Sequence, residues 1–149
     1  MWLSLALVSV CADAQGTLRA AVALAVEYAK AGEALGGPIG SFQAVQHILA
    51  DAYVRANSVE TTNRFAAWAI GNLPSDEALL AARTAKAYLS QVGLQVVEDL
   101  LQVLGGTGQI WEHIAHVYHR RVLFDLQVFG SADTQLAGIA RLRNPRAGT

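Results

Sequence analysis

The sequence predicts an all-α fold, an antiparallel four-helix bundle with a short fifth helix at its C-terminal end. Apolar residues recur at three- and four-residue spacing over long segments, and glycine and proline gather between those segments. No segment alternates apolar and polar residues as a half-buried strand does. With 149 residues the chain is expected to be a single domain, residues 1–149, with a core of its own.

The first helix is expected from about Trp2 to Lys30, ending at the glycine-rich stretch GEALGGPIG of residues 32–40. Its apolar beginning, residues 1–14, ends in the letters ADA, which have the shape of a signal-peptidase site. This beginning lacks the basic residues of a secretory signal, and its apolar run is far shorter than the about 20 residues of a membrane span. A buried helix is therefore favoured over a processed segment. No membrane span is expected, and the predicted location is cytoplasmic.

The second helix is expected to begin at Ser41, a good N-cap, and to stop after Ile70 at the sequence GNLP. The third is expected to begin at Ser75 and to end at the GGTG turn of residues 105–108. Each carries one apolar face. The second buries Phe42, Val45, Leu49, Ala52, Ala56 and Val59, and the third buries Leu79, Ala82, Ala85, Leu89, Val92, Val96, Leu100 and Val103.

A fourth helix is expected over roughly Trp111 to Val128. Ser131 is predicted to cap a short fifth helix that ends near Asn144 and Pro145. The links between the four main helices are short, so that consecutive helices should run antiparallel to each other.

The composition indicates that part of the surface is an interface covered by a partner. Hydrophobic residues make up 53% of the chain and charged residues only 15%, against roughly 25% in ordinary soluble domains. The net charge is −1, and the one basic cluster consists of Arg141, Arg143 and Arg146, so that no nucleic-acid partner is expected. The single cysteine, Cys11, excludes an intramolecular disulfide and fits a reducing compartment.

Residue spacing alone reveals no active site. His113, His116 and His119 recur at every third position, which turns them around a helix instead of directing them at one metal ion. No pair of Glu-x-x-His segments of the kind found in di-metal bundles occurs, so that no metal site is predicted. Six carboxylates could serve acid–base chemistry, but each is expected on a solvated face or at a helix end. They are Asp51, Glu60, Glu98, Asp99, Glu112 and Asp125.

The Gly105-Gly106-Thr107-Gly108 turn allows two interpretations. Glycines between two helices can leave backbone N–H groups free to bind a phosphate or diphosphate. Glycines that follow a helix are also the usual C-caps. Spacing does not decide between these.

Several segments together resemble the C-terminal helical domain of the acyl-CoA dehydrogenase family, from about Ala12 to Leu142. They are AVEYAK (25–30), GGPIGSFQAVQHILAD (36–51), AAWAI (66–70), AKAY (85–88), EDLLQVLGGTG (98–108) and WEHIAHVYHRR (111–121). The forms WEH and FGSA resemble the bacterial branch associated with sterol and unusual acyl-CoA degradation. The order and spacing of the segments carry the resemblance.

The resemblance implies a four-helix bundle that, in complete members, packs with an N-terminal helical domain and a middle β domain, both expected to be absent here. It implies a flavin between domains and subunits, where a carboxylate removes the α-proton and flavin N5 accepts a hydride. Gln43 matches a glutamine near the flavin diphosphate. Gln102, Gly105 and Gly106 match a Q-x-x-G-G segment that contacts the adenosine diphosphate from a neighbouring subunit.

Other family positions are changed. The arginine and phenylalanine that clamp the flavin fall on Gly32 and Leu35, and loss of that arginine removes an interaction worth roughly 1.5–3 kcal/mol. The catalytic glutamate falls near Gly130, and the alternative base on the first helix falls at Leu5 or Ala6. No catalytic residue is therefore assigned, and the chain is not expected to dehydrogenate an acyl-CoA alone.

The favoured hypothesis is a non-catalytic subunit or detached domain of a flavin-dependent acyl-CoA oxidoreductase assembly. Its partner would be a flavin-binding acyl-CoA dehydrogenase subunit in a homo- or hetero-oligomer, with FAD in a shared site and none in the isolated chain. One alternative is a stand-alone bundle that binds an apolar small molecule, as a carrier or a cofactor-free enzyme. The other is a truncated, non-functional remnant of the family.

Overall fold

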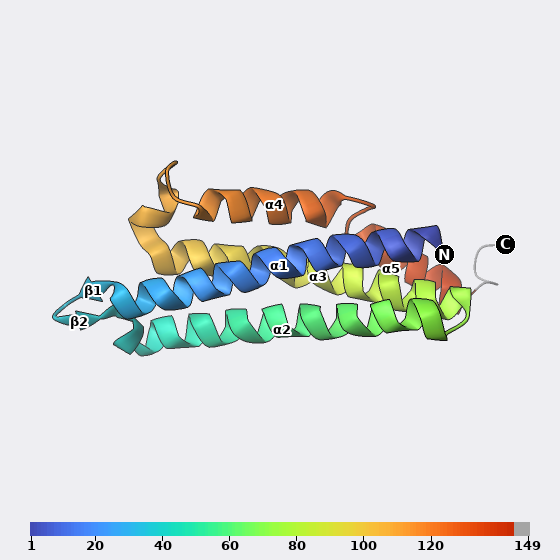
Figure 1. Cartoon of the computed structure of the whole chain (residues 1–149), viewed down its shortest axis with the longest axis horizontal. Coiled ribbons are helices and arrows are strands. Elements are labelled where there is room, and N and C mark those ends of the chain that lie inside the picture. The colour runs from blue at the N-terminus through green and yellow to red at the C-terminus, as the bar shows by residue number, and fades with distance from the viewer. Residues whose placement is uncertain (145–149) are drawn as a thin grey trace.

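The computed structural model describes residues 1–144, so that Pro145 and Arg146 of the predictions lie outside the described residues. The bundle prediction is confirmed: three long helices and a shorter fourth lie side by side, and a fifth follows (Figure 1). The helices are α1 (Trp2–Ala31), α2 (Gln43–Asn72), α3 (Ser75–Leu104), α4 (Ala115–Gln127) and α5 (Ala132–Arg143).

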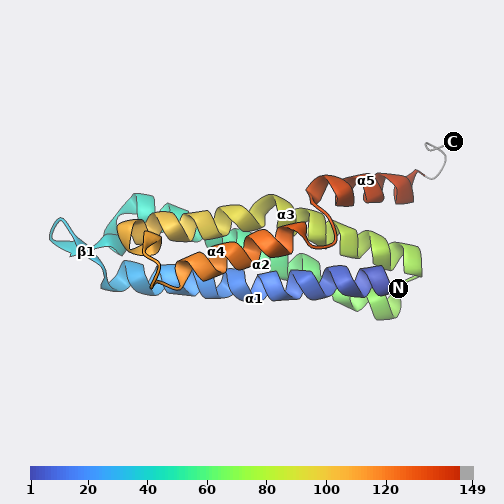
Figure 2. The ribbon, with the colours of Figure 1, turned by 90° about the horizontal axis from the view of Figure 1, so that it is seen from above.

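Helix α3 is the centre of the molecule, because α1, α2, α4 and α5 all pack against it. Figure 2 shows α4 lying along both α1 and α3, with α5 at the opposite end from the link between α1 and α2. The predicted apolar face of α3 is buried, apart from Leu79 and Val92, which are half-buried. A second face is buried as well, and it includes Lys86 and Asp99.

The link between α1 and α2 contains a small two-stranded hairpin, which the sequence pattern did not predict. Strands β1 (Glu33–Ala34) and β2 (Gly37–Pro38) pair antiparallel around Leu35 and Gly36. These two residues have φ values of +54° and +89°, a region that Gly36 enters without strain and Leu35 does not. The hairpin is too short to show alternation, and for this reason the sequence pattern missed it.

Two predicted helix starts are wrong by a few residues. Helix α2 begins at Gln43, because Ser41 lies in a short 3₁₀ turn, η1 (Ile39–Ser41), and its hydroxyl donates to the carbonyl of Pro38 instead of capping. Helix α4 begins at Ala115 instead of Trp111, because the chain after α3 forms a second 3₁₀ turn, η2 (Gly105–Gln109). The chain then reverses its direction over residues 110–114, before α4 begins.

Helix α1 is long and apolar enough to cross a membrane by length and composition, although its first fourteen residues alone are not. The same helix contributes one face to the bundle core, and a third of its most apolar window is buried there. The buried face recurs at helical spacing and includes Leu7, Cys11, Ala14 and Leu18. Part of the apolar surface of α1 is therefore covered within the chain itself.

Candidate functional site

One end of the bundle, which we call the hairpin end, gathers the residues that the family resemblance singles out. It consists of the hairpin, η1, the start of α2, the end of α3 and η2 (Figure 1). The hydroxyls of Tyr28 on α1 and Thr107 on η2 lie 3.3 Å apart and tie the two sides together. Gln43 is the first residue of α2 and Gln102 lies in the last turn of α3, and both are exposed at this end.

The GGTG turn acts as the C-cap of α3, and its first two glycines are exposed. The Gly105 N–H donates to the carbonyls of Gln102 and Leu101, so that it caps α3. Gly105 has a φ of +56°, which favours glycine. A Cβ at Gly105 or at Gly106 would meet no atom within 4 Å, so the backbone is open to an approaching ligand. Gly108 is different, because a Cβ there would come within 2.9 Å of the Leu104 side chain.

This open turn fits part of a diphosphate site. The Gly105 N–H is used in the cap, and the exposed side-chain amides of Gln43 and Gln102 are uncharged donors from which phosphate oxygens accept hydrogen bonds. The position of the family's clamping arginine is Gly32, where a Cβ would come within 3.0 Å of the Tyr28 carbonyl. Leu35, at the position of the clamping phenylalanine, is 97% exposed at the hairpin tip. The residues therefore fit a contributing contact to FAD but not a complete pocket.

The loop between α4 and α5 carries Gly130, near which the family resemblance puts the catalytic base. Gln135 donates from Nε2 to the carbonyls of Phe129 (2.7 Å) and Gly130 (3.3 Å), and Arg83 donates to Gln135 Oε1 at 2.9 Å. Gly130 has a φ of +100°, and a Cβ there would lie 2.7 Å from the Thr134 methyl group. This backbone conformation favours glycine. A carboxylate side chain at position 130 would require the loop to move away from Thr134.

Lys86 is a buried residue that sequence reasoning missed. It is fully buried on α3, and its ammonium donates to Ser90 Oγ at 3.0 Å and to the carbonyls of Leu126 at 2.8 Å and Gly130 at 3.3 Å. Burial lowers the pKa of Lys86. The one available signal was a lysine on an otherwise apolar helical face, and long side chains on such faces usually reach solvent.

The expectation that the carboxylates are solvated is wrong for Asp99 and Asp125, which are 7% and 2% exposed. Asp99 accepts from Arg55 Nη1 at 2.9 Å and from Gln95 Nε2 at 3.0 Å. Asp125 belongs to a cluster at the seam between α1 and α4, in which Arg121 Nε lies 2.6 Å from Asp13 Oδ2 and 3.9 Å from Asp125 Oδ2. Burial raises the pKa of Asp125 to about 6.

The histidines organise the start of α4. His113 accepts from the Ala115 N–H at 3.2 Å, and a ring nitrogen of His116 lies 2.7 Å from the His113 carbonyl. The His116 ring stacks on Trp111, and the guanidinium of Arg120 lies 5.0 Å from the centre of the Trp111 ring. Among residues 1–144, no group of three or more His, Cys, Asp or Glu side chains is placed to hold a metal ion.

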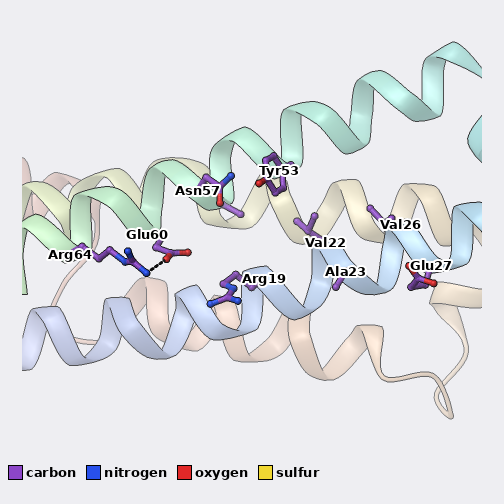
Figure 3. Close-up of a pocket in the computed structure, with 10 residues that line it drawn as sticks. Arg19, Val22, Ala23, Val26, Glu27, Tyr53, Asn57, Glu60 and Arg64 are labelled. Carbon is purple, nitrogen blue, oxygen red and sulfur yellow. Dashed lines mark ion pairs between the residues drawn. The ribbon is translucent and has the colours of Figure 1, made fainter.

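Two grooves lie along the helices, away from the hairpin end. One, of about 580 Å³, lies between α1 and α2; Figure 3 shows Arg19 facing the Glu60–Arg64 ion pair across it. The other, of about 470 Å³, lies between α2 and α3 and is mostly apolar, with Phe65 in its wall and Arg143 at its rim. None of the predicted flavin contacts lines either groove.

The sequence profile of the family described as "Acyl-CoA dehydrogenase, C-terminal domain" matches residues 3–142. The chain belongs to the acyl-CoA dehydrogenase family. This is a family of FAD-dependent oxidoreductases, and the match is to its helical C-terminal domain.

The chain is similar to mycobacterial and steroid-type members. It is 39% identical to the acyl-CoA dehydrogenase FadE34 of Mycobacterium tuberculosis over 78% of this chain, but over 16% of FadE34. The ChsE4–ChsE5 complex of M. tuberculosis superposes with a TM-score of 0.87 at 31% identity, and the Tcur3481–Tcur3483 steroid ACAD G363A variant with 0.90 at 28%. Each covers 99% of this chain, which spans 39% and 40% of the matched chains.

Proposed function

We propose that this chain acts as a non-catalytic subunit or detached domain of a flavin-dependent acyl-CoA oxidoreductase assembly and completes a partner's flavin site. The observation that carries the proposal is the open Gly105–Gly106 turn, which the fold keeps at the same end as Gln43 and Gln102. The clamping and base positions, Gly32 and Gly130, bear no side chain. The chain thus keeps the glutamines and the glycine turn that would contact the flavin, and it lacks the clamping arginine and the catalytic base.

Electrostatics explains why a partner is needed. A flavin diphosphate is negatively charged, and the contacts retained here are neutral donors, which are roughly half as strong as charged ones. The missing arginine alone corresponds to roughly 1.5–3 kcal/mol, or one to two orders of magnitude in affinity. FAD would supply the hydride acceptor, and the partner would supply the arginine and the base.

The exposed surface supports an extensive interface. Large apolar side chains remain exposed on several helices, among them Trp2 on α1, Trp68 on α2 and Phe124 on α4. Exposed aromatic residues in this number are typical of surfaces that bind another protein. The ChsE4–ChsE5 structure is itself a complex of two proteins, and this supports a heteromeric assembly here.

The test is flavin retention by a reconstituted complex. The chain is co-expressed with an acyl-CoA dehydrogenase subunit from the same genome, and FAD is measured by absorbance after gel filtration. Gly106→Asp places a negative charge on the turn, and Gly71→Asp serves as the control, because both glycines are exposed with open space around Cβ. We expect Gly106→Asp alone to weaken FAD binding by tenfold or more. A complex that holds FAD equally well in both variants would contradict the proposal.

The spectrum of the isolated chain with excess FAD comes first. A colourless protein after gel filtration is the expected result, because the charged contact is absent. A co-eluting flavin band would mean that the chain holds the cofactor alone and is more than a contributor to a partner's site.

The apolar groove between α2 and α3 favours one second candidate, a bundle that binds an apolar small molecule. Its about 470 Å³ lies within the range of ligand pockets. Phe65 lines the groove and stacks on Trp68, with 5.8 Å between ring centres, so that the fluorescence of Trp68 in a Trp2→Phe, Trp111→Phe variant reports on occupancy. Titration with decanoate and with decanol tests this candidate; no saturable change with either excludes it.

A further inference from the structure

The seam between α1 and α4 contains a buried carboxylate whose ion pair with Arg121 is long, at 3.9 Å. Asp125 on α4 is 2% exposed, and within the described residues its Oδ2 has no hydrogen-bond donor. An ionised carboxylate in such a place is strongly disfavoured, since burial removes its hydration. The usual solution is to bind a proton.

The cations near Asp125 are already committed to other groups. Lys86, from α3, gives its N–H groups to Ser90 and to the carbonyls of Leu126 and Gly130. Arg121 directs Nε at Asp13 at 2.6 Å and leaves Asp125 at 3.9 Å, beyond hydrogen-bond distance. The remaining titratable neighbour is Cys11 on α1, whose thiol is buried and whose pKa burial raises to about 12, so that it carries no charge.

Asp13 on α1 is the acceptor that a protonated Asp125 requires. Its carboxylate is partly exposed, and the hydrogen bond from Arg121 lowers the pKa of Asp13, so that Asp13 stays ionised. A neutral Asp125 can donate its O–H to this carboxylate, which also satisfies the orphan oxygen. The two carboxyl groups lie near each other, because Arg121 Nε is 2.6 Å from Asp13 Oδ2 and 3.9 Å from Asp125 Oδ2.

We propose that Asp13 and Asp125 share one proton across the seam between α1 and α4, and that this proton fastens α4 to α1. When the proton leaves to solvent past the exposed Asp13, two carboxylates lie beside each other with a single arginine, Arg121, to balance their charge. The seam then loses a hydrogen bond and gains a like-charge repulsion, and α4 separates from α1 more often. The residues of this proton site all belong to this chain, and none of them is among the predicted flavin contacts.

The sign of the pH effect follows from the raised pKa of Asp125. A carboxyl group with a folded pKa of about 6 and an ordinary value of 3.8 stabilises the closed seam below the ordinary value, and this stabilisation is lost as pH rises through 6. Asp13 is ionised in both states above pH 5 and contributes nothing to the change. The opening constant of α4 should therefore rise about tenfold between pH 5 and pH 8.

The proton itself is detected by carboxyl carbon NMR of the full chain labelled at aspartate. We expect one carboxyl resonance that is protonated at pH 5 and titrates near pH 6, and that is missing from the spectrum of Asp125→Asn. A wild-type spectrum in which every aspartate is ionised at pH 5 would overturn the proposal, whatever the stability of the variant.

The fastening of α4 is measured by hydrogen exchange of amides 115–127 at pH 5 and pH 8, corrected for intrinsic rates. The opening constant should rise about tenfold in the wild type and in the control Asp51→Asn, an exposed carboxylate on α2. Asp125→Asn keeps a donor to Asp13 that cannot be lost, and it should show no rise. Equal pH responses in Asp125→Asn and wild type, or none in wild type, would overturn the fastening role.

Discussion

At the scale of the residue, Lys86 connects more of the structure than any other polar side chain considered above. Its ammonium holds the carbonyls of Leu126 and Gly130, which lie at the end of α4 and in the loop to α5. The Gly130 carbonyl also accepts from Gln135 Nε2 at 3.3 Å, whereas the side-chain donor to the Leu126 carbonyl is the fully buried lysine. A single side chain thus sets where α4 ends relative to α3.

We expect Lys86→Met to destabilise the fold by roughly 2–4 kcal/mol, since methionine fills similar space but leaves the Leu126 carbonyl without the lysine donor. The control is Lys30→Met, because Lys30 forms only an exposed pair with Glu27, a pair that typically contributes little. Urea denaturation followed by circular dichroism gives both values. Equal stability of the two variants would mean that water replaces the ammonium.

At the scale of the element, helical periodicity predicted all five helices, and local turn chemistry decided the errors. The stripe of α2 from Val45 to Val59 is buried or half-buried as predicted, but Phe42 is exposed, because it precedes the helix at the N-cap position. Ser41 failed as a cap because its hydroxyl bonds within η1, and Ser131 precedes α5 with its hydroxyl near Thr134 instead of a backbone N–H. Serine is a preferred N-cap residue, but competing local hydrogen bonds decide whether its hydroxyl caps the helix.

A helical glycine provides the prediction at this scale. Gly16 lies in the middle of α1, is exposed, and has open space around Cβ, so that Gly16→Ala should stabilise the chain by about 0.5–1 kcal/mol. Gly93→Ala, in the buried part of α3, is the contrast, because its Cβ would lie 3.1 Å from Leu89. We expect no gain or a loss there. Midpoints of urea denaturation compare the two, and a loss at Gly16 would show that this face of α1 is covered.

At the scale of the whole molecule, the fold was predictable and the buried polar cluster was not. The family resemblance located Gln43, Gln102 and the glycine turn, and the fold places them at one end of the bundle; their contact with a flavin stays a prediction. Asp13 and Arg121 are 108 positions apart in the sequence. Periodicity assigns residues to a face of one helix, but it does not say which charged side chains meet across two helices.

The reactivity of the Cys11 thiol shows whether α1 packs into this bundle without a partner. The thiol is fully buried in the core face of α1, and burial raises its pKa to about 12 from an ordinary 9.0. At pH 8 the thiolate is therefore about a thousandfold scarcer than in an exposed cysteine. If α1 stays packed in the isolated chain, reaction with Ellman's reagent should be slow and should accelerate by at least a hundredfold in 8 M urea. Rapid reaction without urea would mean that α1 leaves the core when the chain is alone. The exposed apolar side chains along α1 and α4 would then be half of a core that only an assembly completes.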